Sequence, residues 1–403
     1  MEKKNTKWVK PRHKVVRKLL GPPIHAFCCM KYGFKVEKLK DGADRQYLVL
    51  YNHQTAFDQF FIGMPFKKLL YYVASEDLFS NGFVSKLIKY LVEPIPIKKQ
   101  STDLRAIMNC IRVAKEGGSI AIAPEGNRTY SGKTEYINPS IASLARKLGL
   151  PIAFVKIEGG YGTQPRWSDV VRRGKTTCRV SRIMEPTEYA ELTDEELGNV
   201  ICDELYVNEA VANARYRHKK RAEYLERAIY VCPVCSLSTF ESKNDTVTCK
   251  KCGLEVKYTE TKEIVSDNPD FKFKFVSDWY DYQKEQILSL DLEPYYEQPL
   301  YTEYSSVREV IPYTKKIPIY KNAEISLYGN KIVASENGQT SEYHFDEISS
   351  LAVLGKNKLN IYIDKRLFQL KPDKRFNALK YVNIFYRYRQ IKKGDNNGQF
   401  LGL

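Results

Sequence analysis

The 403-residue sequence has no run of about 18 uncharged apolar residues, the length needed for a membrane-spanning helix. Lys18 and the residues Gly21-Pro22-Pro23 interrupt the only early candidate. We therefore expect neither a spanning helix nor a secretory signal. The nine cysteines are an odd number, and without a signal they indicate reduced thiols in the cytoplasm.

Acidic residues are scarce at the start of the chain, where residues 1–40 hold only Glu2 and Glu37 against twelve Lys and Arg. Such a run is often a solvated tail, but here apolar and aromatic residues are interleaved with it: Trp8, Val15, Val16, Leu19, Leu20, Ile24, Phe27, Met30, Tyr32 and Phe34. This mixture is typical of a segment that lies in a lipid interface. Together with the net charge of +16, it predicts an anionic partner.

Apolar runs alternate with helical patterns from about residue 45 to 160, which indicates an α/β domain with a largely parallel sheet. We assign residues 41–228 to this domain and expect its last part, 188–228, to be helical. Ligands of such sheets bind at the carboxyl ends of the strands.

The composition changes abruptly at residue 229, where a cysteine-rich segment (229–258) begins. A Tyr-rich connecting region (259–315) follows, then short alternating strands and a terminal amphipathic helix in 316–395, and a flexible tail over 396–403. Several strands with one terminal helix predict a small mainly-β domain, PH-like in pattern. Exposed lysines in its hairpins could contact lipid headgroups, although such lysines are more often solvated.

His53 follows directly on the apolar run YLVLY and so lies just past the end of a strand. Asp58 comes five residues later, which on a regular helix is a rotation of about 500°, so the two residues would not share a face. They can meet if Asp58 lies in the first turn of the next helix. Asp58 would then accept a hydrogen bond from one ring nitrogen and leave the other to take a proton. A chance pair of these residues is the alternative.

A second polar segment, APEGNR, follows the apolar run SIAIA. Arg128 carries a forked, permanent charge that suits phosphate, and Gly126 lets the main chain approach a ligand closely. Further candidates for phosphate binding are Lys98 and Lys99, although a solvated basic turn is the default interpretation of these two residues. Glu125 and Asn52 are expected to orient the site.

In their order and separation, these segments resemble the blocks of the glycerolipid acyltransferase family, typified by the bacterial 1-acyl-sn-glycerol-3-phosphate acyltransferases. NHQTAFD is similar to the family's His-x4-Asp block, through His53 and Asp58. APEGNR is similar to its Pro-Glu-Gly-x-Arg block, and LPIAFVKI to its apolar fourth block. The second block departs from the pattern, because Lys99 stands where the family usually has Arg and no Gly precedes it.

This resemblance implies acyl transfer from acyl-CoA or acyl-carrier protein to a lysophosphatidate hydroxyl, in phospholipid biosynthesis. His53 would be the general base and Asp58 its orienting partner. Another lysophospholipid or glycerol phosphate is an alternative acceptor. The rival hypothesis is a non-enzymatic protein that tethers a partner or nucleic acid to a membrane.

Four cysteines, Cys232, Cys235, Cys249 and Cys252, form a C-x2-C-x13-C-x2-C pattern. Two such knuckles on a hairpin bring four thiolates around one metal ion, so the segment resembles a zinc ribbon with a structural Zn²⁺. A rubredoxin-like iron site and a redox pair are the alternatives. Beside an acyltransferase domain, nucleic acid is a disfavoured partner. We expect a peripheral protein on the cytoplasmic face of the membrane.

Overall fold

The computed structural model describes residues 7–80, 82–97, 103–311 and 314–394. The chain divides into two compact units. Unit 1 comprises residues 1–129, 133–163 and 173–209, and unit 2 comprises residues 130–132, 164–172 and 210–403. Within the described part of the chain, none of the helices is both long and apolar enough to cross a membrane.

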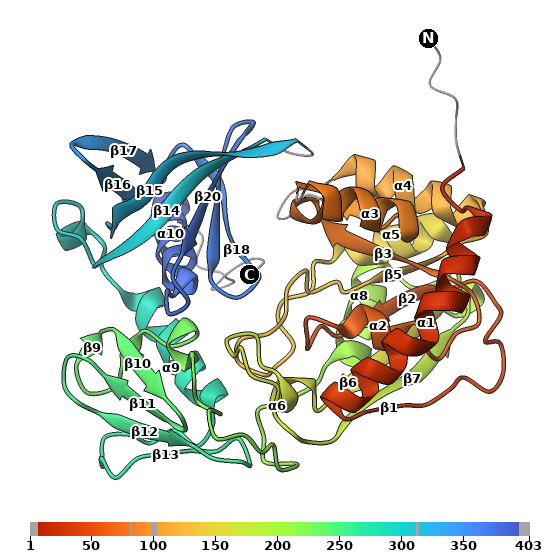
Figure 1. The fold of residues 1–403 in the computed structure, drawn as a ribbon, viewed down its shortest axis with the longest axis horizontal. Coiled ribbons are helices and arrows are strands. Elements are labelled where there is room, and N and C mark those ends of the chain that lie inside the picture. The colour runs from red at the N-terminus through yellow and green to blue at the C-terminus, as the bar shows by residue number, and fades with distance from the viewer. Residues whose placement is uncertain (1–6, 81, 98–102, 312–313, 395–403) are drawn as a thin grey trace. The chain divides into compact units, whose positions relative to one another are not determined.

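Unit 1 is built on a seven-stranded sheet in the order β1-β7-β6-β2-β5-β3-β4 (Figure 1). All neighbouring strands are parallel except β6 and β7. Its strands are β1 (Phe34–Val36), β2 (Leu48–Tyr51), β3 (Leu70–Ser75), β4 (Ile95–Ile97), β5 (Ser119–Ile122), β6 (Ile152–Glu158) and β7 (Thr176–Met184). The predicted α/β fold of the N-terminal half is confirmed.

Helices cover both faces of this sheet, which is why β2 and β5 are continuous apolar runs that are buried throughout. Apolar side chains of α4, α5 and α8 form one core with the sheet, while α1 and α2 contact each other and the strands β1 and β7 (Figure 1). The helices are α1 (Pro11–Tyr32), α2 (Asp58–Ile62), η1 (Glu76–Ser80), α3 (Phe83–Leu91), α4 (Leu104–Lys115), α5 (Ser140–Leu148), α6 (Gly160–Thr163), α7 (Pro186–Tyr189) and α8 (Asp194–Leu205).

The helix expected over residues 188–228 is only partly present, because α8 ends at Leu205 and residues 206–224 form turns and short bridges. Main-chain N–H groups in this stretch bond to distant carbonyls: Tyr216 to Glu260 at 2.7 Å and Ala222 to Asn244 at 2.8 Å. Five Lys and Arg between residues 215 and 221 would also repel one another along a helix. The prediction was therefore wrong for this stretch.

Unit 2 begins its cysteine-rich part with two short antiparallel sheets. They contain β8 (Val231–Cys232), β9 (Ser236–Leu237), β10 (Phe240–Lys243), β11 (Thr246–Cys249), β12 (Glu255–Tyr258) and β13 (Ile264–Val265), preceded by η2 (Leu225–Arg227). Helix α9 (Val276–Ser289) follows, and its Trp279 is fully buried and donates from Nε1 to the carbonyl of Val231 at 2.8 Å. The cysteine-rich sheets and α9 thus share one apolar core.

The C-terminal part is an antiparallel seven-stranded sheet in the order β17-β16-β15-β14-β20-β19-β18, a half-barrel with α10 packed against β18 (Figure 1). Its elements are η3 (Glu293–Tyr295), β14 (Tyr301–Ile311), β15 (Lys315–Leu327), β16 (Lys331–Glu336), β17 (Gln339–His344), β18 (Ile348–Leu354), β19 (Lys358–Ile363), β20 (Arg366–Pro372) and α10 (Ala378–Lys393). The predicted mainly-β domain with a terminal helix is confirmed. Its first strand, β14, lies in the stretch that the sequence assigned to the connecting region.

Two short segments from the first half of the sequence are part of unit 2. The hydroxyl of Tyr130 donates to the carbonyl of Lys356 at 2.7 Å. The buried guanidinium of Arg166 donates to the carbonyls of Val353 and Gly355 at 3.0 and 2.9 Å. Both segments therefore contact the turn between β18 and β19.

Candidate active site and metal centre

His53 and Asp58 meet at the end of β2. Asp58 is the first residue of α2 and is fully buried. The Nδ1 atom of His53 lies 2.8 Å from Oδ2 of Asp58. Because a carboxylate can only accept a hydrogen bond, this contact places the ring proton on Nδ1 and makes Nε2 the nitrogen that can take a proton. The loop-then-helix arrangement expected from the sequence is the one observed.

The carboxylate of Asp58 is held by main-chain and side-chain donors of the intervening loop. It accepts from the N–H of Gln54 at 2.7 Å, from the N–H of Thr55 at 2.9 Å and from the hydroxyl of Thr55 at 2.6 Å. These bonds fix the carboxylate, and through it the orientation of the His53 ring. Sequence reasoning missed Thr55, although the T-x-x-D spacing of Thr55 and Asp58 is a known helix-start signal.

Asn52 joins β2 to β6. Its amide nitrogen donates to the carbonyl of Ile157 at 2.8 Å, and its amide oxygen accepts from the N–H of Ile157 at 2.7 Å. This pair of bonds continues the β2–β6 pairing for one more residue through a side chain. Asn52 therefore fixes the point at which the chain leaves the sheet towards His53.

Glu125 connects the β5 loop to the β2 loop. It is 4% exposed, and its Oε1 and Oε2 atoms accept from the main-chain N–H groups of His53 at 2.9 Å and Glu135 at 3.0 Å. Burial raises the pKa of Glu125 to about 8, since it outweighs these two bonds, which favour the carboxylate, and the carboxylates of Glu135 and Asp58 add to the rise. The side chain thus ties the main chain of His53 to the loop after β5.

The phosphate-binding candidates follow β5, which pairs in parallel with β2. His53 and Arg128 therefore leave the sheet at the same edge. Gly126 has a φ of +69°, a left-handed conformation that favours glycine, and the N–H of Gly126 closes a turn on the carbonyl of Ala123 at 3.0 Å. Arg128 is 8% exposed. Lys98 and Lys99 lie outside the described residues.

Tyr32, the last residue of α1, lies near these groups. Burial raises the pKa of its phenol, and among the nearby charges Arg128 lowers this pKa while Asp58 raises it. The Tyr32 hydroxyl is buried and has no hydrogen-bond partner among the described residues. Sequence reasoning assigned Tyr32 only to the membrane-interface segment, because no local pattern relates the end of this helix to the His53 loop.

The loop after β6 approaches the His53 loop closely. The Oε1 atom of Gln54 accepts from the N–H of Tyr161 at 3.1 Å. A Cβ atom on Gly160 would lie 2.5 Å from the Cβ of Gln54, so only glycine permits this approach. A pocket of about 340 Å³ lies elsewhere, between α5 and α8, and its lining residues include none of the predicted site residues.

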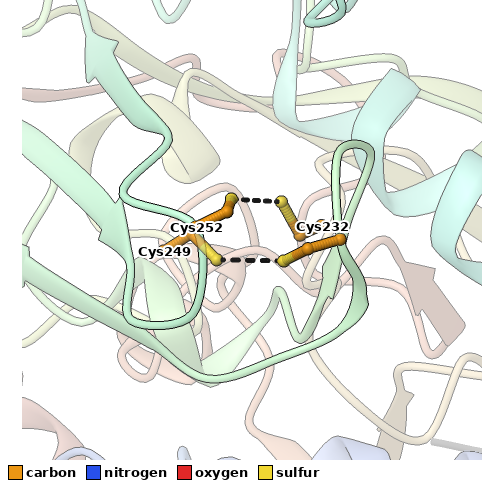
Figure 2. A group of neighbouring side chains, drawn as sticks. Cys232, Cys249 and Cys252 are labelled. Carbon is orange, nitrogen blue, oxygen red and sulfur yellow. Dashed lines mark hydrogen bonds between the residues drawn. The ribbon is translucent and has the colours of Figure 1, made fainter.

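The four cysteines of unit 2 converge. Their Sγ atoms all lie within 4.8 Å of one another, with 3.6 Å between Cys232 and Cys252 and 3.5 Å between Cys235 and Cys249. Figure 2 shows the thiols of Cys232, Cys249 and Cys252 directed towards one another. Four thiolates at Zn–S distances of about 2.3 Å in a tetrahedron are separated by about 3.8 Å, so the arrangement fits such an ion.

A side-chain hydroxyl also approaches the cysteine sulfurs. The hydroxyl of Ser238 lies 3.1 Å from the sulfur of Cys249 and can donate to it. Such bonds stabilise thiolates that bind a metal. The donor set can therefore hold one metal ion with all four positions filled by protein.

One protein-family model matches part of unit 1. The acyltransferase family model matches residues 33–158, which include β2, α2, β5 and His53, Asp58 and Arg128. The match thus covers the segments that carry the candidate active site. The match spans less than half of the chain, and the cysteine-rich and mainly-β parts lie outside it.

Among solved structures, the chain is similar to the 1-acyl-sn-glycerophosphate (LPA) acyltransferase PlsC of Thermotoga maritima, with 24% identity and a TM-score of 0.41 over 49% of this chain and 80% of that chain. It is also similar to the N-terminal PH domain of the human ARAP2 protein, with 15% identity and a TM-score of 0.19 over 23% of this chain and 81% of that chain. Comparison with curated proteins gave no match.

Proposed function

We propose that this chain is a 1-acyl-sn-glycerol-3-phosphate O-acyltransferase, which transfers a fatty acyl group from acyl-CoA or acyl-carrier protein to lysophosphatidate. The observation that carries the proposal is the 2.8 Å hydrogen bond between His53 Nδ1 and Asp58 Oδ2, in a domain that matches the acyltransferase family. The His53 side chain is 25% exposed, so it can be reached by an acceptor, whereas Asp58 is fully buried behind it.

In the proposed reaction, Nε2 of His53 accepts the proton of the acceptor hydroxyl while the hydroxyl oxygen attacks the carbonyl carbon of the thioester. The new C–O bond forms, the C–S bond breaks, and the departing thiolate takes the proton from the imidazolium. Asp58 keeps the Nδ1 proton in place and stabilises the imidazolium. General-base help of this kind is typically worth about 10²–10⁴-fold in rate. No covalent acyl-enzyme is required.

Arg128, with Lys98 and Lys99, would bind the acceptor phosphate and so hold the hydroxyl near His53. The forked guanidinium of Arg128 suits a phosphate, and the left-handed turn at Gly126 carries the chain from β5 towards it. Glu125 and Asn52 would act as positioning residues, because their hydrogen bonds hold the main chain on either side of His53.

Association with the cytoplasmic face of a membrane is part of this proposal, since a lysophosphatidate acceptor resides in a lipid surface. Helix α1 supports it: this helix contains five Lys or Arg and no acidic residue, and it exposes Leu19 (67%), Phe27 (53%) and Met30 (80%). Basic and large apolar side chains on one exposed helix are typical of interfacial binding.

The four cysteines would bind one structural Zn²⁺. The closed set of four thiols supports a structural ion over a catalytic one, because catalytic zinc sites keep one position for water or substrate. The ion would stabilise the small sheets of unit 2 by joining the β8–β9 turn to the end of β11.

The enzymatic proposal is tested by incubating the purified protein with labelled acyl-CoA, or acyl-carrier protein, and lysophosphatidate. We expect labelled phosphatidate from the wild type, and a loss of at least about 100-fold for His53→Ala. The matched control is His344→Ala, which removes an exposed histidine of unit 2 and should leave the rate unchanged. If the wild type transfers no more label than His53→Ala to any of several acceptors, the proposal is wrong and a binding role remains.

A further inference from the structure

Helix α3 exposes large apolar side chains of the kind that a surface helix normally buries. Its one buried residue is Ser85, whose hydroxyl donates to the carbonyl of Leu78 at 2.6 Å. Ile88 and Leu91 are partly buried, and the other large apolar side chains of the helix are exposed. The exposed set is Phe83 (78%), Val84 (54%), Leu87 (43%) and Tyr90 (59%), followed by Val92 (48%) just after the helix.

Positions 83, 87 and 90 are spaced by four and three residues, so their side chains share one face of α3. A surface helix of a globular protein normally turns such a face to the core. Contiguous exposed apolar side chains mark a surface that binds something. We therefore expect the exposed face of α3 to bind another molecule or a surface.

This face continues onto α1. The guanidinium of Arg12 lies 4.4 Å from the ring centroid of Tyr90 and donates from Nε to the carbonyl of Tyr90 at 2.9 Å. The indole of Trp8 donates to the carbonyl of Glu93 at 2.8 Å. These contacts fix the start of α1 to the end of α3, so the two helices that expose apolar side chains are held to each other.

The charge of this surface favours an anionic occupant. Neither α1 nor α3 contains an acidic residue, and Lys86 and Lys89 flank the apolar face of α3, both exposed. Glu93, which follows α3, forms an ion pair with Lys10. Large apolar side chains framed by lysine match the acyl boundary and headgroups of an anionic bilayer.

The sheet topology puts α3 on the side of the active site. Strands β2, β5 and β3 are neighbours and all parallel, so their carboxyl ends lie at one edge of the sheet. His53 follows β2, Arg128 follows β5, and the chain that leaves β3 leads through η1 into α3. The start of α3, with Phe83, therefore lies on the side of the edge from which an acceptor would be taken.

We propose that α3 enters the lipid interface as a second membrane contact beside α1. A single interfacial helix leaves a domain able to roll around the helix axis. Two helices fixed to each other remove that freedom and hold one edge of the sheet towards the bilayer. The proposal concerns membrane binding, and it stands independently of the reaction that the site performs.

The test compares Phe83→Glu/Leu87→Glu with the wild type in co-sedimentation with vesicles of phosphatidylglycerol and phosphatidylcholine. We expect binding to weaken at least tenfold, with an unchanged melting temperature because both side chains are exposed. The matched control is Tyr206→Glu, which adds a charge at another exposed apolar position of unit 1 (54% exposed) and should bind like the wild type.

A gain-of-signal experiment complements this loss. Leu87→Trp should keep vesicle binding, and its added tryptophan emission should shift to the blue and be quenched by brominated lipid, relative to the wild type with its three tryptophans. The proposal is overturned if Phe83→Glu/Leu87→Glu binds vesicles as the wild type does and if the added tryptophan of Leu87→Trp shows neither a blue shift nor quenching by brominated lipid. Loss of transfer from acyl-carrier protein with intact vesicle binding would instead identify α3 as a docking site for an acidic protein.

Failure of the reaction and failure of the membrane contact remain distinguishable. Vesicle binding is measured without substrate, so it does not depend on catalysis. A short-chain acceptor that dissolves in water should be acylated equally by the wild type and by Phe83→Glu/Leu87→Glu, because α3 carries none of the residues that hold the acceptor.

Discussion

Replacing Asp58 by asparagine removes the carboxylate while keeping its shape. Asp58 accepts hydrogen bonds from His53 Nδ1, from the N–H groups of Gln54 and Thr55, and from the Thr55 hydroxyl. An amide offers one oxygen and one NH2 group, so at least one of these donors must face another donor. If the NH2 group faces His53, Nδ1 becomes the acceptor and the proton moves to Nε2, the atom that should receive the substrate proton.

The size of the effect follows from these contacts. The wrong ring tautomer removes general-base catalysis, so we expect the acyl-transfer rate of Asp58→Asn to fall by about 10²–10⁴-fold. One buried donor left without an acceptor costs about 1–3 kcal/mol of unfolding free energy, which the variant should also lose. Because Asp58 is fully buried, water cannot restore the missing bond.

The assay is the single-turnover rate of labelled acyl transfer, measured beside thermal unfolding. Thr55→Val is the matched control: it removes the 2.6 Å bond from the Thr55 hydroxyl to Asp58 but leaves the bond to His53. We expect a similar loss of stability from this control and a rate within about tenfold of the wild type. A rate for Asp58→Asn within threefold of the wild type would refute the reasoning.

Other perturbations test the remaining features. Burial raises the pKa of Glu125 to about 8, so the neutral form of this side chain stabilises the fold below pH 4.5, and this contribution is lost as the pH rises through 8. Glu125→Gln should therefore flatten the decline of the unfolding free energy with pH, measured in a pH series of urea titrations. Metal analysis should find one zinc per chain, and Cys249→Ser should lose it and lower the melting temperature by at least about 4 °C, whereas bound iron would reverse the assignment. Leu19→Glu should weaken binding to anionic vesicles several-fold in co-sedimentation, and unchanged binding would contradict an interfacial role for α1. This substitution is sharper than deleting residues 1–40, which would also remove β1 from the sheet.

The positions of the strand ends that carry the site could be predicted because they follow from the local sequence. Strands β2 and β5 are parallel and buried on both faces, so they must be continuous apolar runs, and polar residues directly after them fall at one edge. The approach of His53 to Asp58 could be predicted for the same reason, since only a loop and a new helix bring them together over five residues.

The bonds that hold the site could not be predicted, because they join residues that are far apart in sequence. Nothing near Glu125 indicates that its carboxylate accepts from the main chain of His53, 72 residues earlier. The end of α8 at Leu205 has a similar origin, since Val207 exchanges hydrogen bonds with Thr134, 73 residues earlier. The inverted face of α3 is a third case: periodicity predicts a helix there, but not which side faces water.

The discontinuous make-up of unit 2 has a consequence for how the chain is synthesised. Arg166 is fully buried, yet the carbonyls that it binds belong to Val353 and Gly355, the latter 189 residues later. At about 5–20 residues per second, the ribosome delivers them on the order of ten to forty seconds after Arg166. During that interval the segment 164–172 has no place to dock. We expect the nascent chain to need protection by chaperones until the last third of the protein has emerged.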